Sequence, residues 1–238
     1  DNSILNTFEK TDGVSFGGSA VAMPEQNVNT KSFTVNGVSF RMIAVKKGTF
    51  KMGSTQKQLD FKEEIGDEYS NYDKPALKVT LTYNYHIGET EVTQELWKAV
   101  MGTNPSRLNG DDYKQYPVDS VHWDNCQAFV TKLNEILAAQ LNGRTFRLPT
   151  NAEWEYAARG GHKKDHDNTD QEYIFAGSDN AADVAWYSSY KDELTYSQPV
   201  KGKNPNELGL YDMSGNVEEW CQDYYYDYTD YDDTEEPK

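Results

Sequence analysis

The 238-residue chain contains, at residues 146–161, the run FRLPTNAEWEYAARGG. Within it, Thr150 and Glu153 have the spacing of a capping box, in which each side chain satisfies a free backbone amide at the start of a helix. Gly160 and Gly161 follow the last apolar positions, where helices commonly end in a left-handed residue. The run therefore predicts a helix that opens at Thr150 and ends at residues 159–161.

Two further helices are predicted upstream of this run. The first is capped by Thr93, has its apolar residues on one face and ends at Gly102. The second covers residues 123–141, where apolar side chains recur at three- and four-residue steps. These side chains are Cys126, Phe129, Val130, Leu133, Ile136 and Leu137. Cys126 is accordingly interpreted as a core residue.

Strand patterns lie before these helices. Residues 39–45 and 49–52 read as two strands separated by Gly48, which predicts a β-hairpin with the glycine in its turn. Residues 53–74 are then predicted to form a polar loop. From Leu77 to Tyr85, apolar and polar residues alternate, so this stretch predicts a strand with one buried and one wet face.

Regular patterns fade after residue 161. Gly, Asn, Asp, Ser and Tyr dominate as far as Pro205, which predicts long structured loops. His162 and His166 stand four residues apart in this region and are interpreted as solvated loop residues rather than metal ligands. No internal repeat of fixed period is found, which excludes solenoids and propellers. The predicted fold class is α+β, with few short helices and strands and many long loops.

The composition limits the classes of partner. A formal net charge of -16 argues against a nucleic-acid partner, because phosphate binding needs clustered Lys and Arg. No apolar run approaches the ~20 residues that span a bilayer, so no transmembrane segment is predicted. The chain begins at Asp1 rather than Met, which removal of an export signal or cloning would each explain. Cys126 and Cys221 lack CxxC spacing, and two buried thiols are predicted in preference to a bridge.

Four segments, taken in order, resemble the formylglycine-generating enzyme family, also called the sulfatase-modifying factor family. Three are short: GTFKMG at 48–53, ETEVT at 89–93, and PV at 117–118 with VHW at 121–123. The fourth block is longer and more specific, and joins residues 146–161 to NELGLYDMSGNV at 206–217. The resemblance runs from about residue 40 to residue 228 and implies the C-type-lectin-like α+β fold of that family.

The resemblance implies one main domain over residues 34–228. Residues 1–33 are expected to form a weakly ordered lead-in, and residues 229–238 an acidic C-terminal end. The tyrosines beside this end are expected to be solvated with it. The alternative is a contact surface for a partner, in which Tyr225 and Tyr228 would take part.

A structural calcium site is also implied by the resemblance. Asp212 and Glu219 would give side-chain oxygens, while Gly215 and Val217 would give backbone carbonyls, the hard ligands that calcium takes. Gly215 would let the backbone curl around the ion. The alternative is that the acidic side chains and Asn216 bind loop amides without a metal.

Two departures from the family bear on catalysis. Glu218 stands where the family has an aromatic residue, at a position expected near the active cleft. The family's oxidases use a C-terminal cysteine pair to bind copper and activate oxygen, and neither Cys126 nor Cys221 matches that pair. No catalytic or other cofactor-binding residue is therefore assigned. Copper is expected only if a segment beyond Lys238 supplies the cysteines.

The sequence leaves two main functions open. The first is a formylglycine-generating-enzyme-like domain of an exported protein (secreted, periplasmic or surface-anchored), which is not catalytic without the cysteine pair. The second is a non-catalytic domain that binds a ligand, as in surface lipoproteins and hypervariable binding proteins of this fold. Relatives that use iron and histidine to join sulfur to histidine derivatives rank last, because no matching histidine helix is present. The expected partner is a protein or peptide.

Overall fold

A computed structural model describes residues 2–4, 7–10, 30–66, 76–168, 172–187 and 196–224. The helices are α1 (Gln56–Ile65), α2 (Gln94–Met101), α3 (Trp123–Leu141), α4 (Asn151–Ala158) and α5 (Ala181–Val184), with 3-10 turns at Asp111–Tyr113 and Gly161–Lys163. The strands are β1 (Asn2–Ile4), β2 (Thr7–Lys10), β3 (Lys31–Val35), β4 (Val38–Val45), β5 (Gly48–Met52), β6 (Leu77–Leu81), β7 (Tyr85–Gly88), β8 (Arg144–Arg147) and β9 (Glu218–Trp220). In this part of the chain, no helix is long and apolar enough to cross a membrane.

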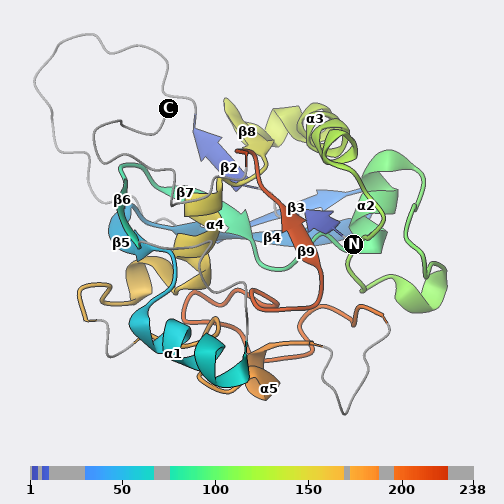
Figure 1. Cartoon of the computed structure of the whole chain (residues 1–238). Coiled ribbons are helices and arrows are strands. Elements are labelled where there is room, and N and C mark those ends of the chain that lie inside the picture. Colours follow the sequence, from blue (N-terminus) through green and yellow to red (C-terminus); the bar gives the residue numbers. More distant parts are fainter. Residues whose placement is uncertain are drawn as a thin grey trace, which may run out of the picture.

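The central sheet has five strands in the order β3-β4-β7-β2-β8. Its β4 strand is antiparallel to both β3 and β7, with Ile43 opposite Ile87. Two small sheets accompany it, in which β5 pairs with β6 and β1 runs parallel to β9. Figure 1 shows the strands in the upper half of the molecule and mostly irregular chain, with α1 and α5, in the lower half.

The predicted helices α2 and α3 are confirmed and build the larger hydrophobic core. Thr93 caps α2 by accepting a hydrogen bond from the Leu96 amide, and the helix ends at Gly102 with φ 82°. The rings of Trp97 and Phe129 stack with centroids 4.9 Å apart where the two helices meet. Cys126 is buried in this core as predicted, whereas Ile136 is 41% exposed and lies outside the buried stripe.

The predicted helix α4 is also confirmed, and its capping box is present. Glu153 is fully buried and pairs with Arg147 at 2.6 Å, which ties the start of α4 to β8. On the same helix, Tyr156 packs against Phe50 of β5 with ring centroids 5.2 Å apart. These contacts place α4 in a second hydrophobic core with β5, β6 and β7.

The predicted β-hairpin is wrong, because β4 and β5 lie in different sheets. Gly48 is the first residue of β5 rather than a turn residue, and a Cβ there would lie 2.0 Å from the hydroxyl oxygen of Tyr156. The glycine is therefore required by the close approach of α4. Alternation over Leu77–Leu81 is confirmed, but the strand ends there and Tyr83 lies in the connection to β7.

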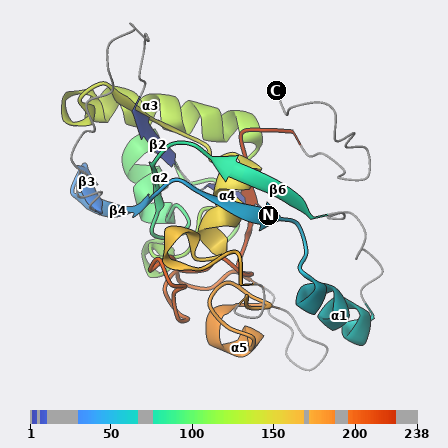
Figure 2. The ribbon, with the colours of Figure 1, turned by 90° about the vertical axis from the view of Figure 1, so that its left-hand side faces the viewer.

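The predicted polar loop at residues 53–74 is also wrong, since it contains α1. Thr55 and Gln58 form a capping box at the start of this helix, and Gly66 follows its last residue with φ 73°. Figure 2 shows α1 standing apart from the sheet at the edge of the molecule.

The region after residue 161 consists largely of structured loops, as predicted. Asn206 anchors them to α4, because its amide nitrogen donates to the carbonyls of Ala157 (2.8 Å) and Ala158 (3.1 Å). The solvated interpretation of His166 is wrong: it is 8% exposed, and its Nε2 donates to the Gly161 carbonyl at 2.8 Å. His162 is half-buried, and its Nδ1 accepts from the Lys46 amide.

Candidate functional site

The predicted calcium ligands lie on one turn of chain that leads into β9. Asp212 is 3% exposed and has a positive φ of 58°. Its Oδ2 accepts from the Lys201 amide at 2.9 Å, whereas its Oδ1 has no hydrogen-bond partner. Glu219 is half-buried as a residue, but its Oε2 is enclosed and also has no hydrogen-bond partner. The turn therefore brings two carboxylates together, each with one orphaned oxygen.

Glu91 is a third carboxylate at this turn, and its role was not predicted from the sequence. It is 2% exposed and accepts from the Val217 amide at 3.2 Å and from the Asn216 side chain at 2.7 Å. Burial raises its pKa well above the ordinary value, and the charges of Glu219 and Asp212 raise it further. Glu91 lies in the connection between β7 and α2, and from there it holds the turn in place through these two hydrogen bonds.

Burial also raises the pKa values of the two predicted ligands. Burial raises the pKa of Glu219 to about 8. The Trp154 indole lies nearby and acts in the opposite direction, but its N–H and the Glu219 carboxylate are not in hydrogen-bond geometry. Burial raises the pKa of Asp212 as well. Acidic groups that lose water in this way ionise readily only beside a positive charge. The orphaned oxygens of Asp212 and Glu219 therefore fit a hard divalent cation.

The metal-free interpretation of the turn also matches some contacts. Asp212 accepts from the Lys201 amide, and Asn216 Oδ1 accepts from the Gln198 amide at 2.8 Å. Across the described ranges, no three His, Cys, Asp or Glu side chains are grouped closely enough to hold a metal. A cation at this turn would consequently need backbone carbonyls, such as those of Gly215 and Val217, in addition to carboxylates.

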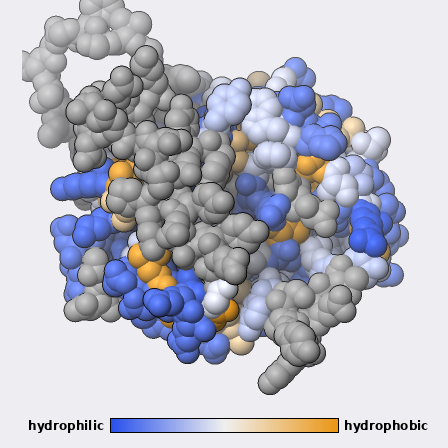
Figure 3. All heavy atoms as spheres, in the orientation of Figure 1, coloured by the Kyte–Doolittle hydropathy of each residue, from blue (hydrophilic) through white to orange (hydrophobic). Residues whose placement is uncertain are grey.

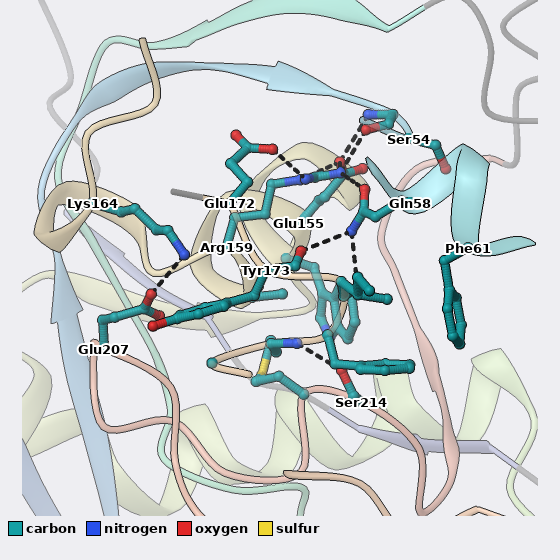
Figure 4. Close-up of a pocket in the computed structure, with 18 of the residues that line it drawn as sticks. Ser54, Gln58, Phe61, Glu155, Arg159, Lys164, Glu172, Tyr173, Glu207 and Ser214 are labelled. Atoms are coloured by element: carbon teal, nitrogen blue, oxygen red, sulfur yellow. Dashed lines mark hydrogen bonds and ion pairs between the residues drawn. The ribbon is translucent and has the colours of Figure 1, made fainter. Parts of the chain in front are cut away.

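A second candidate site is a cleft of about 450 Å³ between α1 and α4. One wall is formed by α1, with Phe61 and Ile65, and the facing wall by α4, with Trp154 and Arg159. The rest comes from residues 172–177 and from Gly53, Ser54, Lys164, Glu207, Met213 and Ser214. Figure 4 shows Phe61 and Gln58 on the α1 side and Glu155 and Arg159 on the α4 side.

Arg159 is the centre of the polar network in this cleft. Its guanidinium donates to Glu155 at 2.8 Å, to Glu172 at 3.2 Å and to the Gly53 carbonyl at 2.5 Å. Lys164 pairs with Glu207 at 2.8 Å (Figure 4). These charges are compensated within the protein, so the cleft offers a ligand mainly apolar and aromatic surface.

The cleft continues into a smaller hollow of about 320 Å³. The two share Lys164, Glu172, Tyr173 and Glu207, and the smaller one extends past Lys57 to Asp179. The Lys164 ammonium lies 3.8 Å from the centroid of the Tyr173 ring, and both residues line the two parts. An elongated ligand could therefore occupy both.

The two cysteines are free thiols. Cys126 is buried as predicted, and Cys221 is half-buried. Burial raises the pKa of each thiol to about 12, so both stay protonated at neutral pH. Neither cysteine lines the cleft, and nor does Glu218, which is exposed on β9. Tyr225, Tyr228 and residues 229–238 lie outside the described residues.

Comparison with known proteins matches residues 25–236 to the family model of the sulfatase-modifying factor enzyme 1-like domain. The chaperone protein LppX of Paenibacillus barcinonensis is 33% identical over 192 residues, covering 62% of this chain and 64% of that protein. A formylglycine-generating enzyme of Thermomonospora curvata is 33% identical over 135 residues, covering 54% of this chain and 39% of that enzyme. The chain thus spans less than two thirds of either relative.

Solved structures share the fold. Treponema denticola variable protein 1 superposes with a TM-score of 0.65 and 32% identity, covering 83% of this chain and 78% of that chain. PvdO from Pseudomonas aeruginosa has a TM-score of 0.56 at 21% identity, covering 79% and 73%, and this similarity concerns the fold alone. The predicted α+β fold class is thereby confirmed. The chain belongs to the sulfatase-modifying factor enzyme 1-like family and has the C-type-lectin-like fold of formylglycine-generating enzymes.

Proposed function

We propose that this chain is a ligand-binding domain of an exported protein and that it holds a protein or peptide segment in the cleft between α1 and α4. The lining of the cleft carries this proposal. Aromatic and aliphatic side chains surround a polar floor whose charges are already paired, and the described lining residues include no cysteine or histidine. Sites of this composition bind ligands by apolar burial, with a few polar groups that fix orientation.

Two observations support binding rather than oxidation. Copper-dependent oxidation needs closely spaced thiolates, whereas Cys126 and Cys221 are protonated and shielded. The relatives include a formylglycine-generating enzyme, whose match covers 54% of this chain, but the match to a chaperone protein covers 62% and that to a variable protein 83%.

A structural calcium ion at the 212–219 turn is part of the proposal. Asp212 and Glu219 would hold it with side-chain oxygens, and Gly215 and Val217 with carbonyls. The ion would supply positive charge to three buried carboxylates that otherwise repel one another. Its support is the orphaned oxygen on each of Asp212 and Glu219.

The proposal can be tested by selecting peptides from a random display library against the purified chain. Binding of a selected peptide is then measured by fluorescence polarisation for the wild type, Phe61→Ala and Ile136→Ala. Phe61 lines the cleft, whereas Ile136 is equally apolar but lies on α3 and is 41% exposed. We expect Phe61→Ala to weaken binding about fivefold or more and Ile136→Ala to leave it unchanged.

The same preparation tests the competing function. A cysteine-containing peptide is incubated with the chain, copper and oxygen, and its mass is followed. Conversion of the cysteine to formylglycine would favour an oxidase and contradict the proposal. Failure to select any peptide, or equal weakening by both variants, would remove the cleft as a binding site.

A further inference from the structure

The two helices that form the walls of the cleft differ in how much they pack against the rest of the protein. On α4, Tyr156 and Ala157 are buried in the second core, and Glu153 is ion-paired below them. On α1, none of the ten side chains is buried. Helices of this length are marginal in water when they stand alone, so α1 depends on the few contacts that it makes with its neighbours.

Those contacts are mostly polar, and the ion pair among them in the described residues is exposed. Lys57 pairs with Asp179 at 2.6 Å, and the two side chains remain 40% and 48% exposed. The amide of Gln58 donates to the Ile174 carbonyl at 3.0 Å. Exposed ion pairs of this kind contribute little to stability, so the attachment of α1 to residues 172–179 is weak.

The backbone just before α1 is held by two hydrogen bonds. The Gly53 amide donates to Glu155 at 2.8 Å, and its carbonyl accepts from Arg159 at 2.5 Å. Both partners belong to the end of α4. Gly53 has φ 103°, and α1 starts two residues later at its cap, Thr55. The backbone is therefore fixed at Gly53, next to the buried Ser54. Beyond the cap, one longer bond of 3.3 Å joins the Arg159 guanidinium to the Gln58 side-chain oxygen on α1.

The C-terminal end of α1 carries exposed apolar surface. Ile65 is 61% exposed although it lines the cleft. Phe61 meets Phe175 edge to face, with centroids 5.5 Å apart. Figure 3 shows apolar side chains at the surface in the region of α1, at the lower left. An apolar group placed between the walls would cover these side chains.

We propose that α1 is a hinged wall of the cleft, which pivots at Gly53, is latched by the Lys57–Asp179 pair and closes on an apolar group of the ligand. A ligand that touches both walls binds the closed arrangement better than the open one and so shifts the population toward it. This inference rests on the proposed function for the identity of the site, but the hinge is a property of the chain alone.

The hinge is tested by amide hydrogen exchange on the whole chain without ligand. We expect the amides of α1 to exchange about tenfold or more faster than those of α4, because opening α1 exposes no core. Lys57→Asp should accelerate exchange in α1 about threefold, since it removes the exposed ion pair with Asp179 and a 3.3 Å hydrogen bond to the Glu172 carbonyl, and places two like charges together. The double variant Lys57→Asp/Asp179→Lys should slow exchange in α1 again, although not fully to the wild-type rate, because Asp179 also accepts from the Ile174 amide at 3.0 Å. Exchange in α4 should not change. Exchange in α1 as slow as in α4, or no response to Lys57→Asp, would overturn the hinge.

The apolar closure is tested with Nile red, a neutral dye that fluoresces in apolar surroundings. Titration of the wild type should give a saturable signal, and Ile65→Asn should weaken it about threefold or more through the loss of apolar contact. Ile136→Asn is the matched control, because Ile136 is also exposed but lies on α3. Equal effects of the two variants would overturn closure on an apolar group.

These outcomes separate the inference from the proposed function. If selected peptides bind but α1 is as protected as α4, the binding function stands and the hinge is wrong. If α1 exchanges rapidly and responds to Lys57→Asp but no peptide is selected, the hinge stands and the binding function is wrong.

Discussion

Gly215 is a residue of the 212–219 turn at which the structure leaves no room for a larger side chain. Its φ is 85°, and a Cβ at this position would lie 2.2 Å from the backbone carbonyl oxygen of Trp186. The same carbonyl accepts from the Asn216 amide at 2.8 Å. We expect Gly215→Ala to lower the free energy of unfolding by about 2–4 kcal/mol, through the clash and the positive φ together.

Gly102→Ala is the matched control in urea denaturation. Gly102 has φ 82°, but a Cβ there would meet nothing within 4 Å. Gly102→Ala should lower the free energy of unfolding by only about 1 kcal/mol, the cost of placing a residue with a Cβ at positive φ. Equal losses for the two variants would mean that the backbone near Trp186 yields and that the turn is not tightly seated.

Glu153 is the residue whose charge should matter most for the pH dependence of stability. Burial opposes its ionisation, but the hydrogen bonds and charge of Arg147, together with hydrogen bonds from the Thr150 amide and the Tyr83 hydroxyl, outweigh burial, so its pKa lies below the ordinary value of 4.5. Its contribution is therefore present above that value and is lost as the pH falls through the lower folded-state pKa. We expect Glu153→Gln to cost about 3 kcal/mol or more at neutral pH, because Arg147 loses its partner.

The difference between wild type and Glu153→Gln should shrink in acid, where the wild-type carboxyl becomes neutral too. Urea denaturation at pH 7 and near pH 3 measures this difference. Glu64→Gln, an exposed change on α1, is the control and should have little effect at either pH. A loss that is the same at both pH values would show that the variant acts through packing.

At the scale of elements, β5 and α4 meet at Gly48. A Cβ on Gly48 would lie 2.0 Å from the Tyr156 hydroxyl oxygen and 2.9 Å from the ring carbon that bears it. We expect Gly48→Ala to cost about 1–3 kcal/mol by overpacking. The cost should be smaller in a Tyr156→Phe background, because the closest atom is then absent. A double-mutant cycle measures this coupling, and simple additivity would contradict the assigned contact.

The elements that could be predicted from sequence were those with local signals. Caps at Thr93 and Thr150 and apolar periodicity sufficed for α2, α3 and α4. For α1, the signal was the Thr55–Gln58 capping box with Gly66 behind it, but its apolar residues form no stripe, because the helix buries none of them. Gly48 was assigned to a turn because the contact that requires a glycine comes from Tyr156, more than a hundred residues away.

The candidate sites also differ in how far they could be predicted from the sequence. The 212–219 turn could be predicted because its ligands are close in sequence and resemble a known family, although its calcium ion stays a prediction. Glu91 could not, since its contacts with Asn216 and Val217 join segments far apart in the chain. The cleft could not either, because its walls come from α1, α4, residues 172–177 and the loop after Asn206.

At the scale of the whole molecule, the irregular half is attached to the sheet half by the second hydrophobic core and by several hydrogen bonds. One is the Glu91–Asn216 contact and another is Asn206 on the end of α4. If calcium binds at the 212–219 turn, it strengthens the Glu91–Asn216 attachment and stabilises the fold as a whole. We expect calcium at about 100-fold above its Kd to raise the Tm by about 5 °C or more, and a chelator to reverse this.

Two neighbouring glutamates make this prediction specific. Glu219→Gln should abolish the calcium-dependent shift in Tm, because it removes a proposed ligand with an orphaned oxygen. Glu218→Gln should retain the shift, since Glu218 is exposed. Calorimetry with and without calcium measures both. No shift in the wild type, or its loss in both variants, would favour a turn held by amide hydrogen bonds alone.

The shielding of the two thiols has a practical consequence for experiments on single molecules. Because Cys126 is buried and burial raises the pKa of both thiols to about 12, maleimide reagents at neutral pH should leave the native cysteines unlabelled. Cysteines introduced by Glu64→Cys on α1 and Lys132→Cys on α3, both exposed positions, would then accept a donor and an acceptor dye. The dye pair would then report the distance between α1 and α3, and so the movement of α1 relative to the rest of the fold, without removal of a native residue.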